Sequence, residues 1–425
     1  MIQKRYLNKK LVLFIYLIMV IIELYFIYNK SDLVIGLSNW ENKSKEILNF
    51  KLPSDNFYGP GGAILLAPFL WNSPDYFIAI SFYAILGFYF YFKICEKIQN
   101  DKFRYFALII PLMNVYLFWL FVSSQDTVFE FAFFMAFIRY ATEEKWIKAT
   151  LAAIILAETR SAYWLIIILG IFCLCFLRSK NGRIFNRKAF LIIPAFILIS
   201  MFNFISYGSA SPALGGGMTA YFSFAKHHYL SLPKFDMDVF LSGPNGEFTK
   251  QELKEELSNA KSGAEVDRIY YKFAFRSAIE NPMETVLGLM QKFESHLINI
   301  QKVPQLPGKY VFDYETNSIN IQNERLNWNL VLGNLLYEGY RFFMLIFGLI
   351  GLGITIVLKK LDNSRFDLKN LEMISLFWIM SIMPALLYYS ETRFKIVQEV
   401  SLIPLIVLIY LQFLKSTNEA KSPHH

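Results

Sequence analysis

Long apolar blocks alternate with short, charge-bearing polar segments along most of the chain. A helix needs about 20 apolar residues to cross the hydrocarbon core of a bilayer, and it satisfies its own backbone hydrogen bonds there. The blocks therefore predict an all-α polytopic membrane protein with about ten transmembrane helices. The predicted spans are residues 11–28, 76–92, 105–122, 127–138, 149–157, 162–177, 189–205, 340–358, 371–389 and 396–414.

Composition agrees with this pattern. Of the 425 residues, 55% are hydrophobic and 18% are charged, whereas a soluble domain carries roughly a quarter charged residues. The net charge of +8 does not indicate nucleic acid, because the Lys and Arg residues lie beside the spans, where the positive-inside rule places them. The three cysteines lie in or beside spans and indicate no disulfide framework.

The basic clusters also predict an orientation. The densest clusters between spans all fall on one side when the spans are counted in order, which places both chain ends in the cytoplasm. We expect an N-terminal transmembrane module (residues 1–205) with a first outside loop at 29–62. An outside loop domain (206–332) and C-terminal transmembrane helices (333–425) follow it.

The outside loop domain carries two helical patterns, near residues 249–262 and 265–296. The first opens with Thr249 and Glu252, which have capping-box spacing. Pro282 interrupts the second pattern, and proline ends or kinks a helix. We therefore predict a loop domain built of helices.

Three basic residues lie in short outside turns, against the positive-inside rule: Arg160, Arg393 and Lys395. One interpretation is that their side chains snorkel to the headgroups of the outer leaflet. The other is that they bind an anionic group such as a lipid-linked phosphate, which Arg can grip with two hydrogen bonds. Because two separate turns share the anomaly, we prefer the second.

Several carboxylates lie on the same side. Asp126 opens the span at 127–138, where it is either a helix N-cap or part of the chemistry. Glu130 follows on the same helix face inside the apolar region, where an ionisable group usually faces a cavity or a partner. Asp32, Glu41 and Asp55 lie in the first outside loop. Each alone fits a solvated surface carboxylate, and as a set they are candidates for a general base or a metal ligand.

Four segments, in this order, resemble motifs of the GT-C membrane glycosyltransferases. This class uses polyprenyl-phosphate sugars and includes protein O-mannosyltransferases and aminoarabinose transferases. The segments are residues 56–68, the turns at 123–126 and 158–161, and residues 391–395 before the last span. Residues 278–292 also resemble the Asn-Pro helix that precedes the later spans of the class.

The resemblance implies an active site on the outer side of a bacterial inner membrane. In the class, an acidic residue of the first outside loop is catalytic; Asp32 matches by position, and Glu41 is its rival because the usual spacing to a tyrosine is not reproduced. The turn carboxylate maps to Asp126. The contacts to substrate and lipid phosphate map to Arg160, Arg393, Lys395, Tyr58 and Asn56.

The expected partners are a polyprenyl-phosphate-linked sugar donor, a glycan or lipid-linked oligosaccharide acceptor, and membrane lipid. Members of the class work with or without a divalent metal, so a Mg²⁺ or Mn²⁺ site involving Asp126 stays open. Two other functions also stay open. One is a polymerase of O-antigen or capsule repeat units, and the other is a polyprenyl-lipid transporter or flippase, although the sequence shows no internal repeat of the kind transporters carry.

Overall fold

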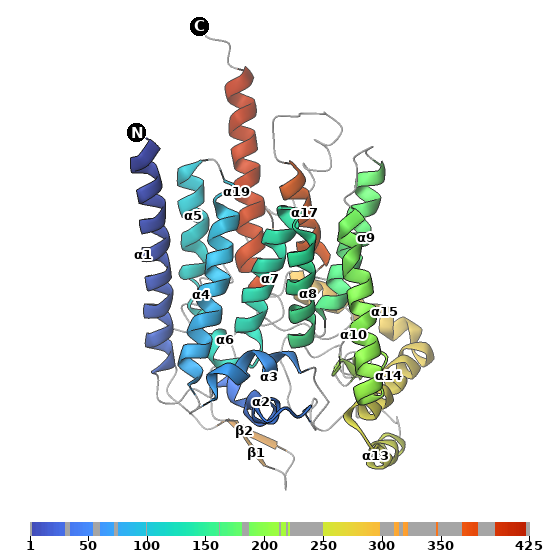
Figure 1. Cartoon of the computed structure of the whole chain (residues 1–425). Helices are drawn as coiled ribbons and strands as arrows, with labels where there is room; N and C mark the ends of the chain where they lie inside the picture. Colours follow the sequence, from blue (N-terminus) through green and yellow to red (C-terminus); the bar gives the residue numbers. More distant parts are fainter. Residues whose placement is uncertain are drawn as a thin grey trace.

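The structure is a computed structural model of the whole chain, and it describes residues 2–29, 35–53, 60–71, 75–98, 100–160, 162–180, 187–211, 214–217, 220–221, 250–297, 310–313, 318–321, 346, 368–380 and 396–421. Most of the described chain is helical, in a bundle with smaller elements at one end (Figure 1). The bundle helices are α1 (Ile2–Tyr28), α4 (Tyr76–Cys95), α5 (Asp101–Leu112), α6 (Val115–Ser123), α7 (Thr127–Thr142), α8 (Trp146–Thr159), α9 (Tyr163–Lys180), α10 (Ile192–Tyr207), α17 (Leu368–Met380) and α19 (Ile396–Lys421).

The smaller elements lie in the predicted outside loops and in two connections. They are η1 (Gly36–Trp40), α2 (Glu41–Leu48), α3 (Gly61–Leu66), η2 (Ala67–Phe69), η3 (Arg187–Leu191), α13 (Lys250–Asn259), α14 (Gly263–Glu280), α15 (Pro282–Leu297), β1 (Tyr310–Asp313) and β2 (Ser318–Ile321). Pro282 separates α14 from α15, so the helical patterns of the outside loop domain are confirmed.

The described part of the chain is helical, as predicted, apart from one short antiparallel pair, β1–β2, which was not predicted. Its register pairs Tyr310 with Ile321 and Phe312 with Ile319. Aromatic and β-branched residues favour a pleated surface, and such a short pattern is hard to separate from a loop by sequence.

Among the described residues, three helical segments are long and apolar enough to cross a membrane: Lys9–Tyr28, Tyr76–Cys95 and Arg187–Tyr207. A fourth candidate is the pair α5–α6, which is bent by 46° at its break. Pro111 near the end of α5 cannot donate a backbone hydrogen bond, and Asn114 starts α6 anew by accepting a hydrogen bond from the Leu117 amide at 2.8 Å. The predicted continuous span at 105–122 is therefore broken in two.

The remaining predicted spans are shorter helices or lie partly outside the described residues. The spans at 127–138, 149–157, 162–177 and 396–414 correspond to α7, α8, α9 and α19. Only the first part of the span at 371–389 is described, in α17, and the span at 340–358 is described at residue 346 alone. The total of about ten spans stays a prediction.

Helix α7 occupies the middle of the bundle. It packs on α4 and α8, while α1 packs on α4, and α17 contacts both α9 and α19. The core around α7 is aromatic, with fully buried Phe129, Phe131, Phe134 and Phe137 on this helix. Gly87 of α4 allows the close approach of α7, because a Cβ there would lie 2.4 Å from the Phe131 ring.

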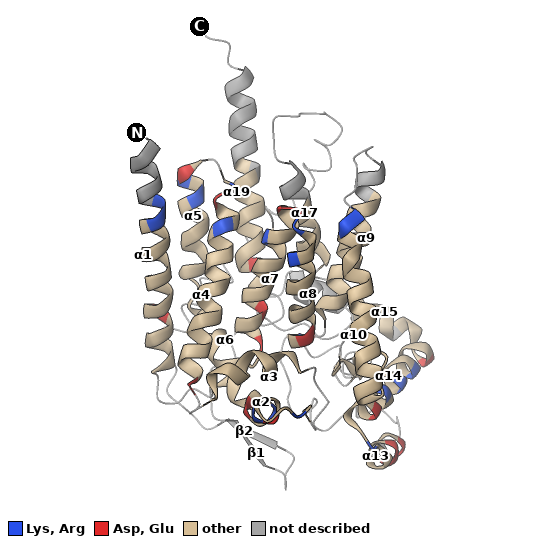
Figure 2. Ribbon diagram, viewed as in Figure 1, with Lys and Arg blue, Asp and Glu red and all other residues tan. Residues whose placement is uncertain are grey.

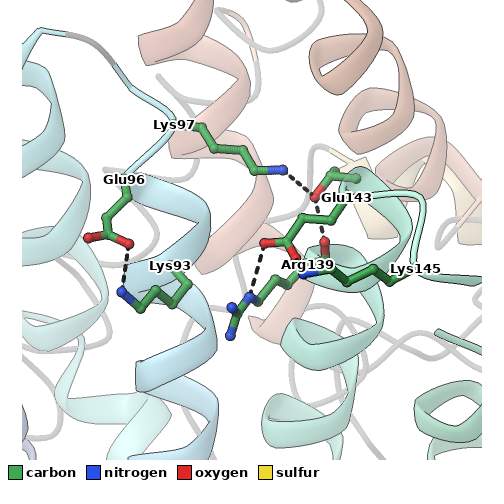
Figure 3. Close-up of polar contacts among 7 residues, drawn as sticks. Lys93, Glu96, Lys97, Arg139, Glu143 and Lys145 are labelled. Carbon is green, nitrogen blue, oxygen red and sulfur yellow. Dashed lines mark hydrogen bonds and ion pairs between the residues drawn. The ribbon is translucent and has the colours of Figure 1, made fainter. Parts of the chain in front are cut away.

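Basic residues mark one end of the bundle, where α1 begins and α19 ends (Figure 2). At this end Lys93 pairs with Glu96 at 2.8 Å, and Arg139 pairs with Glu143 at 3.2 Å. Lys145 also pairs with Glu143, and Lys97 donates to the Thr142 hydroxyl (Figure 3). We call the six residues labelled in Figure 3 the basic rim. The first loop and α13 lie at the opposite end (Figure 1).

Candidate functional site

The turn between α6 and α7 opens the candidate site, at the end of the bundle opposite the basic rim. Ser124 Oγ donates to Asp126 Oδ1 at 2.8 Å, and the Asp126 side chain makes no capping hydrogen bond to α7. Its other oxygen, Oδ2, lies 3.3 Å from Arg160 Nε. The Asp126 side chain therefore does not cap α7 with a hydrogen bond, as the N-cap interpretation required. Its carboxylate pairs with Arg160 instead.

Arg160 follows the last residue of α8 and turns its side chain into the bundle. Besides Asp126, its guanidinium pairs with Glu130, one turn further along α7. The Arg160 side chain is only 5% exposed, so it does not snorkel to headgroups. Within this arrangement the cation is balanced by two carboxylates of the protein, which together with Arg160 carry one net negative charge when both are ionised.

Glu130 is fully buried and connects three parts of the bundle. Its Oε1 accepts a hydrogen bond from the Tyr163 hydroxyl at the start of α9, and another from Gln398 Nε2 on α19 at 3.1 Å. Gln398 also contacts the Tyr163 hydroxyl. We call Asp126, Glu130, Arg160, Tyr163 and Gln398 the buried network. Low local dielectric strengthens such bonds and makes a missing partner costly.

The buried network is only partly visible in the sequence. Asp126, Glu130 and Arg160 stand out as charges beside or within apolar spans, as predicted for groups that face a partner. Tyr163 and Gln398 were missed. Gln398 had one signal: it is an uncharged amide that follows Arg393 and Lys395 closely and begins a long apolar helix.

The first loop docks onto the turn at 124–126. Trp40 Nε1 donates to the Gln125 carbonyl at 2.8 Å. Gly36 lies so close that a Cβ would fall 2.2 Å from the Ser124 carbonyl carbon. Any larger residue at position 36 would therefore push the loop away from the turn.

The loop also reaches the second turn, after α8. A Cβ on Gly61 of α3 would meet Glu158 backbone at 2.7 Å. Ser44 of α2 donates to the Ala63 carbonyl at 3.0 Å, which holds α2 and α3 together. The first loop thus contacts both turns that resemble the family motifs, one through η1 and the other through α3.

Glu41 holds α2 against the bundle. Lys45 Nζ lies 2.5 Å from its Oε1, and the Tyr76 hydroxyl of α4 donates to its Oε2. The bond from Lys45, and then that from Tyr76, lower the pKa of the Glu41 carboxyl. An ionised carboxylate with both oxygens engaged is a weak proton acceptor, so this geometry does not favour Glu41 as a general base.

Six predicted site residues lie outside the described residues: Asp32, Asp55, Asn56, Tyr58, Arg393 and Lys395. One of them adjoins a described element of the site. Lys395 immediately precedes Ile396, where α19 begins, and Gln398 of that helix touches Glu130. Among the described residues, no three His, Cys, Asp or Glu side chains are grouped as ligands of one metal ion. The question of a divalent metal therefore stays open.

No family model, no curated protein and no solved structure matches this chain. The resemblance of the four motifs to the GT-C class is a prediction that these comparisons do not support. Function must be argued from the site itself.

Proposed function

We propose that this chain is an integral membrane glycosyltransferase of the bacterial inner membrane, with its active site facing the periplasm and both chain ends in the cytoplasm. It would transfer a sugar from an undecaprenyl-phosphate donor to a periplasmic glycan or lipid-linked acceptor in the synthesis of cell-surface polysaccharide. The basic rim supports this orientation, since Lys and Arg favour the cytoplasmic side.

One observation carries the proposal: the first loop and the turns at 124–126 and 158–160 are assembled at the end of the bundle opposite the basic rim. In sequence these segments are separated by two helical hairpins. A reaction on a lipid-linked substrate at the outer surface needs such a covered polar site, because water must be displaced where charge develops.

The proposed chemistry is a single displacement with inversion. A carboxylate of the first loop, Asp32 in preference to Glu41, removes the proton of the acceptor hydroxyl. The polyprenyl phosphate leaves, and cations stabilise its growing negative charge. Arg393 and Lys395 take that role first, because Arg160 is already bound to Asp126 and Glu130. Arg160 would then position the beginning of α19 through the buried network.

A transfer assay tests the proposal. Purified protein in liposomes receives a radiolabelled undecaprenyl-phosphate sugar and a glycan acceptor, and label in the acceptor is counted. We expect transfer in the wild type, a loss of at least about 100-fold in Asp32→Asn, and a smaller loss in Glu41→Gln. Glu46→Gln, on the same helix as Glu41, is the matched control. A full loss in Glu41→Gln with an active Asp32→Asn would exchange the two roles.

The same assay separates the polymerase. Chain growth from a pyrophosphate-linked repeat unit, with no transfer from any single-sugar donor, would replace our proposal by a polymerase of O-antigen or capsule repeat units.

The transporter or flippase is favoured by a specific observation. The bent pair α5–α6 and the buried charges of α7 are both features of transporters, in which broken helices and intramembrane ions line the pathway. Movement of a fluorescent polyprenyl lipid between leaflets, without turnover of either donor, would support this second candidate.

A further inference from the structure

An apolar face runs along the outside loop domain from the second half of α14 through α15. Six large apolar side chains form it, and each is more than half exposed: Phe275, Ile279, Met283, Val286, Leu287 and Met290. We call these six residues the α15 face. Soluble proteins rarely leave an apolar patch of this extent uncovered without a binding partner.

The spacing within α15 places these side chains on one side of the helix. Met283, Val286, Leu287 and Met290 follow the helical repeat, whereas Gly288 lies buried on the opposite side. The core of the domain uses other residues, including the fully buried Phe273 and its neighbour Ala274 on α14. The residues of the α15 face therefore take no part in the core of this domain.

The domain is attached to the bundle where a candidate span ends. Arg268 Nη2 of α14 donates to the Gly208 carbonyl at 3.0 Å, immediately after α10. Side chains near this end of α10 are exposed and apolar, including Phe204 at 60% and Ile205 at 80%. In Figure 1, α15 lies at the height of the lower half of the bundle, whereas α13 lies beyond its end. The α15 face is thus level with apolar surface of a candidate span.

Charged residues border the apolar side of α14, with Lys272 one turn before Phe275 and Arg276 directly after it. Lys272 pairs with Glu256 at 2.5 Å, and Arg276 pairs with Glu252 at 3.0 Å and Glu280 at 2.9 Å. These exposed ion pairs require water, whereas the α15 face requires an apolar medium. A helix divided in this way fits a bilayer interface, with its apolar side among acyl chains and its charges in the headgroup layer.

We infer that the α15 face rests in the outer leaflet, and that its partner is the acyl chains of the membrane lipids. This inference depends on the orientation proposed above and not on glycosyl transfer. It would hold the outside loop domain at the membrane surface, at the level where a lipid-linked substrate arrives.

Depth-dependent fluorescence quenching tests the inference in the full chain. Leu287→Cys is labelled with nitrobenzoxadiazole in a background in which Cys95, Cys173 and Cys175 are replaced by Ala. The protein is reconstituted in phosphatidylcholine–phosphatidylglycerol liposomes, and a spin-labelled lipid and aqueous iodide serve as quenchers. Lys261→Cys, exposed between α13 and α14, is the aqueous control. Ile197→Cys on α10, whose native side chain is 55% exposed, is the membrane control.

We expect the label at position 287 to be quenched by the lipid and to be protected from iodide by about threefold or more relative to position 261. Quenching of 287 by iodide alone, with 197 quenched by lipid, overturns the inference and leaves the membrane placement intact. Protection of 287 from both quenchers shows that protein covers the face, and also overturns it. Failure of lipid to quench 197 overturns the membrane placement itself.

The native chain gives a second measurement that needs no substitution. A photoactivatable diazirine lipid in the outer leaflet should form adducts in the α15 peptide. Adducts on α10 without any on α15 would contradict the inference.

Discussion

Helix α7 carries an arginine–carboxylate network at each end, and the two differ in burial. At its beginning, Asp126 and Glu130 pair with Arg160, whose side chain is 5% exposed. At its end, Arg139 and Glu143 pair in the basic rim with side chains 17% and 22% exposed (Figure 3). Lys145 reaches the same Glu143, and the Arg139 guanidinium lies 5.6 Å from the centre of the Tyr140 ring.

Arginine–carboxylate pairs at the two ends therefore contribute differently to stability. Partly exposed pairs gain little because water competes for both charges and salt screens them. Buried pairs gain little over an apolar core, but removing one partner leaves an uncompensated charge. The buried network therefore fixes how α7, α9 and α19 meet, whereas the basic rim mainly marks the end of the bundle that we propose faces the cytoplasm.

The largest effect is expected at Arg160. Arg160→Met should lower the free energy of unfolding by about 3–5 kcal/mol, because Asp126 and Glu130 lose their buried cation. Thermal unfolding in detergent measures this loss. Arg160→Lys should recover only part of it, since an ammonium cannot copy the planar fork. Stability equal to wild type in Arg160→Met would show that the carboxylates are neutral or hydrated.

Asp267 on α14 is a buried carboxylate that contrasts with the buried network, because it makes no ion pair within the part of the chain that the structure describes. Its Oδ1 accepts the Gly217 amide at 2.5 Å, yet burial raises the pKa of its carboxyl to about 6. Because the pKa is higher in the folded than in the unfolded chain, its protonation stabilises the fold at low pH, and this contribution is lost as pH rises through about 6. Asp267→Asn should remove that decline between about pH 4 and 6, worth at most about 3 kcal/mol. Unfolding curves across this range measure it, and an unchanged slope would contradict the assignment.

Gln398 tests whether α19 depends on the buried network. Gln398→Leu should cost about 1–2 kcal/mol, since it removes the amide donor from buried Glu130 while Tyr163 remains. A double-mutant cycle with Tyr163→Phe should show coupling of about 0.5–1 kcal/mol. Additive effects would mean that the two donors act on Glu130 independently. If α19 positions Arg393 and Lys395, Gln398→Leu should lose much of its transfer activity while its free energy of unfolding changes only by this small amount.

The smallest effect is expected in the basic rim. Arg139→Ala should cost about 1 kcal/mol or less and should lose most of that difference at high salt. The comparison with Arg160→Met in the same detergent and salt is the matched control for residue type. A cost equal to that of Arg160→Met would remove the distinction between the two ends.

The sequence predicted the helical elements well where apolar blocks were long. The segments Lys9–Tyr28 and Tyr76–Cys95 match the first two predicted spans closely, because crossing length is a property of local composition. Hydropathy predicted the structure less well where single residues or a short strand pattern decided it. The examples are the break between α5 and α6 and the hairpin of β1 and β2. Pro111 and Asn114 carried the signal for the break, but hydropathy alone outweighed them.

For the candidate site, composition and spacing along the chain already marked the charges at 126, 130 and 160 as unusual, because they lie in short outside turns or in an apolar segment. How these charges pair with one another became visible in the folded arrangement alone. That arrangement turned Asp126 from a helix cap into a partner of Arg160, engaged both oxygens of Glu41, and brought Tyr163 and Gln398 to Glu130. The reason is physical: burial and ion pairing are set by neighbours far away in the chain, and Gln398 is 268 residues from Glu130.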